Sequence, residues 1–227
     1  MISLQRLKAK VLRARLLHYA LWGFTLVSIF LAVKLSNAGN SITFDLSTGF
    51  IISVIFYWMV VWIPEQRRRG LIKQNLREQY RLFREDSIGI FLDATGTGYE
   101  ANLPKQLSDQ GQFRKYFKEA ATDSQTRWDC ALNRLGRDEM LLRELLVEME
   151  ILMNEVGYVL NNVNIDDRDT FSFFKRLSQA VYKLKDSKPE YDDVKQLSGF
   201  LWQLFAGWSF IDGYQKNDIV EMMIEKI

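Results

Sequence analysis

The chain has 227 residues, of which 48% are hydrophobic and 26% charged, and its formal net charge is +2, so its overall charge does not indicate nucleic-acid binding. Its single cysteine, Cys130, excludes an intrachain disulfide and a cysteine zinc site. The single histidine, His18, precedes the first apolar run, so the rest of the chain lacks the commonest general base and metal ligand.

Two apolar runs near the N-terminus predict a transmembrane hairpin, with spans over about residues 16–34 and 46–63. Each run has about 18 uncharged residues, near the lower limit for crossing a hydrocarbon core of about 30 Å. Lys34 closes the first run and can extend to the headgroups. Aromatic side chains typical of membrane interfaces flank the runs: Tyr19, Trp22, Tyr57, Trp58 and Trp62.

Positive charges flank the predicted hairpin on both outer sides. They are Arg6, Lys8, Lys10, Arg13 and Arg15 before the first span and Arg67, Arg68 and Arg69 after the second. The connector, Leu35 to Asp45, contains neither lysine nor arginine. The positive-inside rule therefore predicts that both termini are cytoplasmic.

The first apolar run has a second interpretation, as a cleaved signal peptide ending at Ala38. The run is longer than the usual ~7–15 residues, and cleavage would leave only a small external stub before the second span. The hairpin is therefore favoured. The segment 1–15 before it has leucine and valine at helical spacing among basic residues, which predicts an amphipathic helix on an anionic membrane face or a plain topology signal.

Small residues recur on both predicted spans. Ser28 and Ala32 are four apart on the first span, and Gly49 and Ser53 are four apart on the second. This spacing allows close helix approach and homo-oligomer assembly, although it is also common by chance in membrane helices. Thr25, Ser28, Thr48 and Ser53 are the mildly polar residues available to line an assembled pore.

The chain after the hairpin, residues 64–227, predicts a cytoplasmic helical bundle with an irregular insert. Pro64 either kinks the chain or starts a helix, and Glu65 to Glu85 has helical apolar spacing. Ser87 to Leu92 is expected to be a short strand or a buried turn, and Asp93 to Gln112 an irregular segment. A phosphate site at Gly96 and Gly98 is the alternative there, but the P-loop lysine is missing.

Further helices are predicted over Phe113 to Ala121, Thr126 to Leu135 and Asp138 to Val163, the last with Asp138 as its N-cap. Asp169 or Thr170 is expected to cap the next helix. The neighbouring aspartates suggest a metal site as an alternative, but the glycine and distal glutamate of a calcium loop are missing.

The last segment starts near Tyr191. Leu197 to Ile211 is apolar but short for a span, so it is expected to be a buried core helix that ends at Asp212-Gly213. Asn217 or Asp218 is expected to cap a final helix over 219–227. The expected fold class is mostly α, with a transmembrane hairpin followed by an all-helical cytoplasmic bundle.

No enzyme motif is found, and neither a cofactor nor a metal is expected. Two classes of function remain. The first is a membrane-acting effector whose spans permeabilise the membrane on release from inhibition. The second is a membrane-anchored scaffold or sensor with a helical interaction domain. Small residues on both spans favour the first.

The basic N-terminus, the run LLHYALWGFTLVSIFLAV, the brief connector, the run FIISVIFYWMVVWIPEQRRRG and the helical remainder together resemble the two-span toxic effectors of bacterial anti-phage defence systems. The retron-associated kind is the most similar in length and layout. The resemblance covers the whole chain through its organisation, without a diagnostic motif.

The resemblance implies that a reverse transcriptase and its RNA–DNA product restrain the chain, and that infection releases it to damage the inner membrane (abortive infection). Contacts with such a partner would involve scattered cations such as Arg114, Lys115, Lys118 and Arg127. The simpler interpretation of these four cations is an ordinary solvated helix face.

Overall fold

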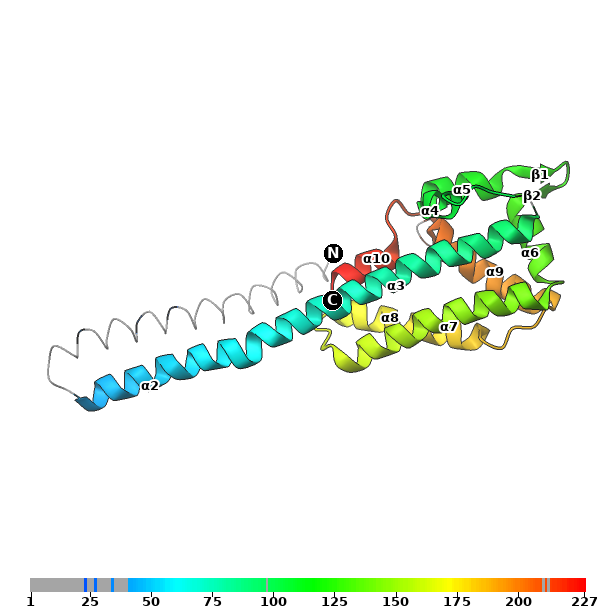
Figure 1. Cartoon of the computed structure of the whole chain (residues 1–227). Coiled ribbons are helices and arrows are strands. Elements are labelled where there is room, and N and C mark those ends of the chain that lie inside the picture. The colour runs from blue at the N-terminus through cyan, green and yellow to red at the C-terminus, as the bar shows by residue number, and fades with distance from the viewer. Residues whose placement is uncertain are drawn as a thin grey trace. The chain divides into compact units, whose positions relative to one another are not determined.

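The computed structural model describes residues 41–96, 98–209, 211 and 213–227, together with residues 23, 27 and 34 (Figure 1). Contacts divide the chain into two units, 1–70 and 71–227. The described residues are mostly helical. The 1–15 segment and most of the first predicted span lie outside them, including these predicted site residues: Arg6, Lys8, Lys10, Arg13, Arg15, Thr25, Ser28 and Ala32.

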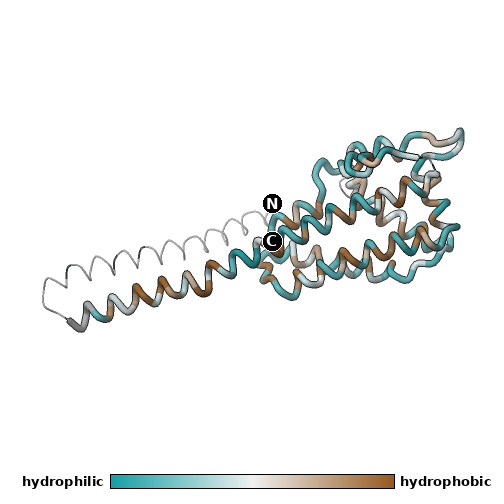
Figure 2. Tube along the Cα trace, viewed as in Figure 1, coloured by the Kyte–Doolittle hydropathy of each residue, from teal (hydrophilic) through white to brown (hydrophobic). Residues whose placement is uncertain are grey.

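The described part of the first unit is helical. Helix α2 (Ser41–Tyr57) leads into a π-helical turn, η1 (Trp58–Trp62), and then into α3 (Ile63–Thr95). The last five residues of the predicted connector, 41–45, are therefore helical. Among the described residues, the helix from Thr48 is the one that is long and apolar enough to cross a membrane. Figure 2 shows its concentration of hydrophobic residues.

The π-helical turn has a local cause in Pro64. A proline inside a helix has no N–H to donate and its ring crowds the carbonyl four residues earlier. Here the preceding residue, Ile63, donates its N–H to the Trp58 carbonyl five residues back. This wider turn places Pro64 at the start of α3, where its missing N–H costs little. Pro64 therefore neither breaks nor ends the helix.

The second unit begins within α3, which corrects the prediction for 87–92. This run is helical and forms the C-terminal part of α3, which ends at Thr95. Ile88, Phe91 and Leu92 are completely buried, and they continue the helical spacing of Tyr80. A short apolar run has too few residues for periodicity to distinguish a helix from a strand, and here tertiary contacts on one helix face decide its conformation.

The segment predicted to be irregular, 93–112, contains ordered helix. Helix α4 (Leu103–Leu107) has a proline in its first turn, and α5 (Gln110–Lys118) begins where Asp109 accepts a 2.9 Å hydrogen bond from the Gln112 N–H. The prediction missed both starts. After α5, the strands β1 (Ala120–Thr122) and β2 (Gln125–Thr126) form a small antiparallel pair.

The three following helices match their predictions closely: α6 (Arg127–Leu135), α7 (Glu139–Asn162) and α8 (Arg168–Leu184). Asp138 caps α7 as predicted, because its carboxylate accepts hydrogen bonds from the N–H groups of Met140 and Leu141. The predicted cap of α8 was wrong. Asp167, not Asp169 or Thr170, is the cap, and its carboxylate accepts from the Thr170 N–H at 3.1 Å.

The C-terminal elements include a second small strand pair, so the unit is not all-helical as predicted. They are α9 (Tyr191–Ala206), β3 (Trp208–Ser209), β4 (Gly213–Tyr214) and α10 (Ile219–Glu225). Helix α9 is a buried core helix as expected, but it ends at Ala206, because Gly207 adopts φ +62°. Asp218 caps α10, as predicted.

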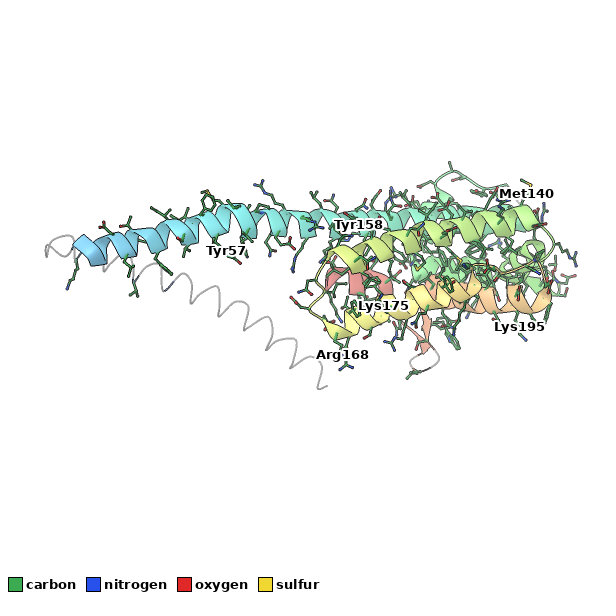
Figure 3. The ribbon with its side chains drawn as sticks, turned by 90° about the horizontal axis from the view of Figure 1, so that it is seen from below. Tyr57, Met140, Tyr158, Arg168, Lys175 and Lys195 are labelled. Carbon is green, nitrogen blue, oxygen red and sulfur yellow. The ribbon has the colours of Figure 1, made fainter. Side chains whose placement is uncertain are left out.

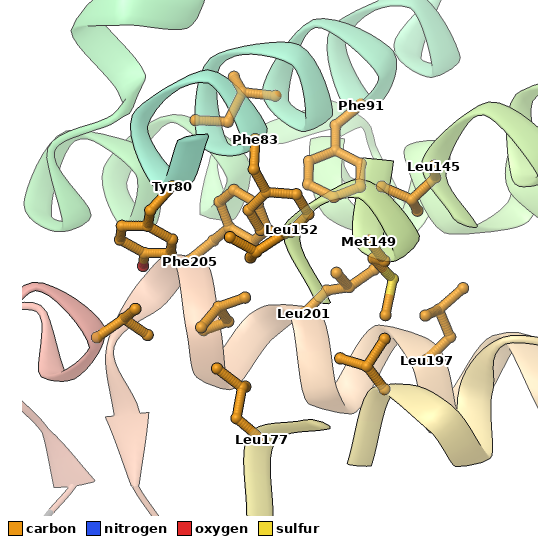
Figure 4. Close-up of a cluster of buried hydrophobic side chains, with 14 of the residues drawn as sticks. Tyr80, Phe83, Phe91, Leu145, Met149, Leu152, Leu177, Leu197, Leu201 and Phe205 are labelled. Carbon is orange, nitrogen blue, oxygen red and sulfur yellow. The ribbon is translucent and has the colours of Figure 1, made fainter. Parts of the chain in front are cut away.

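An aromatic cluster lies within the core of the second unit, and Figure 4 shows two of its members, Phe91 and Phe205, among other buried hydrophobic side chains. The Phe91 ring lies 5.4 Å from the Phe205 ring and 5.2 Å from that of Trp128, centroid to centroid. Phe113 and Phe117 complete the cluster, so α3, α5, α6 and α9 share one core. The cluster brings together residues up to 114 positions apart, Phe91 and Phe205, which no local sequence pattern predicts.

Candidate functional site

The apolar helix of the first unit exposes its side chains instead of burying them. The exposed fractions of Ile52, Ile55, Phe56 and Val60 are 60%, 49%, 62% and 53%. Removing apolar surface from water is worth about 25 cal/mol per Å², so a helix that exposes so much of it is unfavourable in water. A lipid environment removes this penalty, which makes α2 and η1 the candidate membrane-contact surface.

The C-terminal end of this helix changes from aromatic to basic within a few residues. Trp58 and Trp62 stack with ring centroids 5.1 Å apart, and Tyr57 beside them is 49% exposed. Arg69 donates to the Glu65 carboxylate at 3.0 Å. The order of aromatic rings followed by arginines is the order expected where a helix leaves the hydrocarbon core for the headgroups.

The predicted lipid-contact arginines that the structure describes lie on the first turns of α3. Arg67 and Arg68 are exposed, whereas Arg69 is partly buried and paired with Glu65. Because an ion pair between residues four apart on a helix is worth only about 0.3–0.5 kcal/mol, lipid phosphates can compete for Arg69.

Three of the six predicted assembly residues lie on α2. Gly49 and Ser53 are exposed and Thr48 is partly exposed. A Cβ atom added at Gly49 would meet no atom within 4 Å, so its surface is open. The Ser53 hydroxyl donates to the Gly49 carbonyl at 2.8 Å. This bond satisfies the hydroxyl within its own helix, so Ser53 does not need a polar neighbour in the membrane.

Among the four predicted partner cations, Arg114 binds backbone carbonyl groups on either side of the β3–β4 strand pair. Its guanidinium donates to the carbonyls of Ala206 at 2.9 Å and Gln215 at 3.3 Å. These two bonds hold the end of α9 close to the residue after β4. Arg114 and Lys118 also lie over the Tyr214 ring, 4.9 Å and 4.6 Å from its centroid. Such cation–π contacts suit a folded surface and leave these cations less available to a ligand.

These cations also affect Tyr214 itself. Burial alone would raise the pKa of its phenol, but hydrogen bonds with Lys118 and Trp202 and the positive charges of Lys118 and Arg114 outweigh burial. The pKa of Tyr214 therefore lies below its usual value.

Arg127 is engaged in the same way. It donates to the Glu119 carboxylate at 2.6 Å and to the Tyr116 carbonyl at 3.2 Å, and its guanidinium lies 4.2 Å from the Tyr116 ring centroid. Lys115 is exposed on α5. The structure therefore brings Arg114 and Lys118 together at Tyr214, while Arg127 packs at a different ring.

Sequence reasoning missed a buried polar cluster where α3 meets α10. Arg84 is 3% exposed and forms an ion pair with Asp218, which also accepts a 2.7 Å hydrogen bond from the Tyr80 hydroxyl. Burial raises the pKa of Tyr80 well above its usual value. Burial also opposes the charge on Arg84, but its interactions with Tyr80 and Asp218 outweigh that effect and raise its pKa.

The sequence signal for this cluster was Arg84 itself, which falls on the apolar stripe of α3 four residues after Tyr80. A charge on a core face needs a buried counterion. About two turns before Arg84, Arg77 forms an ion pair with the Glu225 carboxylate, and about one turn before Arg77, Lys73 donates to the Glu225 carbonyl at 2.5 Å. Successive turns of α3 thus hold α10 by charge.

Among the described residues, no group of three or more His, Cys, Asp or Glu side chains is placed to hold a metal ion. Of the aspartates that suggested a metal site, Asp167 caps α8 by accepting from the Thr170 N–H at 3.1 Å and from the Thr170 hydroxyl at 2.6 Å. Comparisons of the chain with protein-family models, curated proteins and solved structures find no match.

Proposed function

We propose that this chain is a bacterial inner-membrane protein. A hairpin with spans over 16–34 and 46–63 inserts from the cytoplasm, and both termini and the second unit remain on the cytoplasmic side. The observation that carries this proposal is the exposed apolar surface of α2 and η1, followed by the stacked Trp58 and Trp62 and the basic start of α3.

Accessibility of single cysteines tests this topology. In a Cys130→Ser background, Asn40→Cys reports on the connector and Lys115→Cys on the second unit. A membrane-impermeant maleimide applied to intact spheroplasts is expected to label position 40 and to label position 115 only after lysis. Labelling of position 115 in intact spheroplasts, or release of the chain by alkaline carbonate, would contradict the proposal.

We further propose that the chain is an anti-phage effector, whose hairpins permeabilise the inner membrane when an inhibitory complex releases it. Three features support this: the resemblance in layout, the short connector and the open surface at Gly49 on α2. By the same resemblance, the restraining partner is a reverse transcriptase with its RNA–DNA product. Neither enzymatic activity nor a cofactor is part of the proposal.

Expression of the chain alone, with a voltage-sensitive dye, tests the effector role. Growth arrest with depolarisation is expected. Gly49→Leu together with Ser28→Leu should abolish it if close helix approach assembles the pore, whereas Leu46→Ile, a volume-conserving change on α2, should leave it intact. Normal growth without depolarisation at confirmed membrane expression would contradict the effector role.

The alternative is a membrane-anchored scaffold or sensor, and two observations favour it. The Ser53 hydroxyl is satisfied by its own helix, and Arg114, Lys118 and Arg127 all make contacts within the second unit. In this case the expression experiment yields membrane-integrated, non-toxic chain, and purification from the native host identifies the bound partner.

A further inference from the structure

Tyr214 is a surface tyrosine whose hydroxyl group receives N–H donors from two helices. Its side chain is 43% exposed on β4. Lys118 of α5 and Trp202 of α9 both donate hydrogen bonds to the phenol oxygen, and Arg114 of α5 adds a second positive charge. Because N–H donors and positive charges stabilise an anion, all three groups favour the ionised form of this phenol.

These groups are held in place by the fold. The Lys118 ammonium is 4.6 Å and the Arg114 guanidinium 4.9 Å from the centroid of the Tyr214 ring. Arg114 is fixed there by its two hydrogen bonds to backbone carbonyls. The Trp202 ring lies 5.1 Å from that of Trp128 in the aromatic cluster. The donors are therefore in position before any reagent arrives, as in sites that stabilise a developing oxyanion.

We propose that Tyr214 is a nucleophilic tyrosine, a modification site whose phenol oxygen accepts an acyl group from an activated acyl donor. The ionised phenol is the reactive form, because its oxygen supplies the electron pair of the new bond. This role goes beyond membrane anchoring and permeabilisation. It depends on the second unit alone, so it holds independently of the proposed membrane location.

The lowered pKa of Tyr214 has two opposing effects on the rate of such a reaction. It raises the ionised fraction at neutral pH, and it weakens the nucleophile. For thiolate nucleophiles the Brønsted slope is about 0.4–0.5, so only about half of the logarithmic gain in ionised fraction is lost. With a similar slope for phenolates, the net effect at neutral pH is a faster reaction.

Two tyrosines that are more exposed provide an internal comparison. Tyr182 is 68% and Tyr191 78% exposed. Lys185 lies 4.4 Å from the Tyr182 ring centroid, and Lys195, which Figure 3 labels on α9, lies 5.6 Å from that of Tyr191. Within the described part of the chain, neither hydroxyl accepts a hydrogen bond. Both therefore share a nearby lysine with Tyr214 but lack the donors on its oxygen.

Acylation would alter how β4 is held. The ionised oxygen attacks the acyl carbon, an O–C bond forms, and the bond from that carbon to the leaving group breaks. The product is a neutral ester, so Lys118 and Arg114 lose the negative charge that they stabilise, and the hydrogen bond from Trp202 is weakened. Since these donors belong to α5 and α9, we expect the ester to loosen β4 from both helices.

Acetylation of the full chain in detergent with N-acetylimidazole tests the proposal. The reagent transfers its acetyl group to phenolates and releases imidazole, and hydroxylamine afterwards removes acetyl groups from tyrosine but not from lysine. Mass spectrometry of peptides gives the initial rate at each tyrosine. At neutral pH, Tyr214 is expected to react several-fold faster than Tyr182 and Tyr191, although it is the least exposed of the three.

Lysine substitutions separate the hydrogen bond on the oxygen from the charge over the ring. Lys118→Met should slow the acetylation of Tyr214 several-fold, and Lys118→Arg, which keeps a charged donor, should retain most of the rate. The matched control is Lys185→Met. It removes a lysine that lies about as close to a tyrosine ring but does not donate to the hydroxyl, so the rate at Tyr182 should be nearly unchanged.

Two results would overturn the proposal: Tyr214 reacting no faster than Tyr182 and Tyr191, or an unchanged rate at Tyr214 in the Lys118→Met chain. Tryptophan fluorescence reports whether each variant stays folded, and if Lys118→Met unfolds, the comparison of the three tyrosines in the unaltered chain decides. The advantage of Tyr214 should shrink as the pH rises toward its pKa. An advantage that stays constant there would indicate better access instead of ionisation, and would also count against the proposal.

Discussion

The two units of this protein treat the same kinds of side chain in opposite ways. In the first unit Ile55 is 49% and Phe56 62% exposed, whereas in the second Ile88 and Phe91 are completely buried. The difference follows from how polar residues are distributed around each helix. The helix around Ile55 is apolar on all sides, a pattern that needs an apolar environment all round, whereas α3 beyond Gly70 concentrates its apolar residues on one stripe. One pattern suits lipid and the other a core.

The largest effect is expected from charges placed in the apolar helix. Ile52→Arg with Phe56→Arg should prevent membrane insertion of this helix, because each arginine near the centre of a span costs about 2.5–3.5 kcal/mol. The second unit would then cross to the outside behind the first span. A C-terminal alkaline phosphatase, which is active only outside the cytoplasm, should become active.

The matched control places the same charges on exposed aromatic residues of the second unit. Tyr182→Arg with Tyr191→Arg, at positions 68% and 78% exposed, should leave the reporter inactive. An inactive reporter in the Ile52→Arg/Phe56→Arg chain, at equal expression, would show that this helix is not a membrane span.

In the second unit, the largest loss is expected at the centre of the aromatic cluster. Phe91→Ala should lower the free energy of unfolding by about 3–5 kcal/mol, because it leaves a cavity among four rings. Urea titration in detergent, followed by tryptophan fluorescence, measures the change. Phe171→Ala, at a position 39% exposed, should cost less than about 1 kcal/mol. Equal losses would mean that the cluster is not the core.

A smaller loss is expected when the buried ion pair is broken but the cap is kept. Asp218→Asn can still cap α10, yet it leaves Arg84 buried without a counterion, at a cost of about 3 kcal/mol. The same change at the exposed cap of α5, Asp109→Asn, should be nearly neutral. Urea titrations of both variants decide this, and similar midpoints for the two would indicate that Arg84 finds another partner.

The smallest effect is expected at Asp86, where burial and then Glu85 raise the carboxyl pKa, partly opposed by Arg81. A raised pKa in the folded state means that the ionised carboxylate destabilises the fold at neutral pH. Protonation removes this effect as the pH falls. Asp86→Asn should therefore raise the free energy of unfolding at pH 7 by less than about 0.5 kcal/mol, and the gain should vanish near pH 3. Asp186→Asn, on an 87% exposed side chain, serves as the control.

Helix positions in the second unit were predictable wherever a strong cap met a regular apolar stripe. Asp138 and the stripe of α7 are one such case, and Asp218 before α10 is another. The prediction failed at 87–92 and 103–107, where the local run is short and the deciding contacts come from distant residues such as Phe205. The two small strand pairs were also missed, because each strand has only two or three residues and lies in a short segment between packed helices.

The amino-acid sequence by itself determined the helical character and the apolar helix that starts near Thr48, because hydropathy and helical period are local properties. The tertiary structure alone decided which charges are used internally. It buried Arg84 against Asp218 and turned Arg114 toward the Ala206 carbonyl. These outcomes depend on which residues meet across more than 90 positions of chain, and a local pattern does not contain that information.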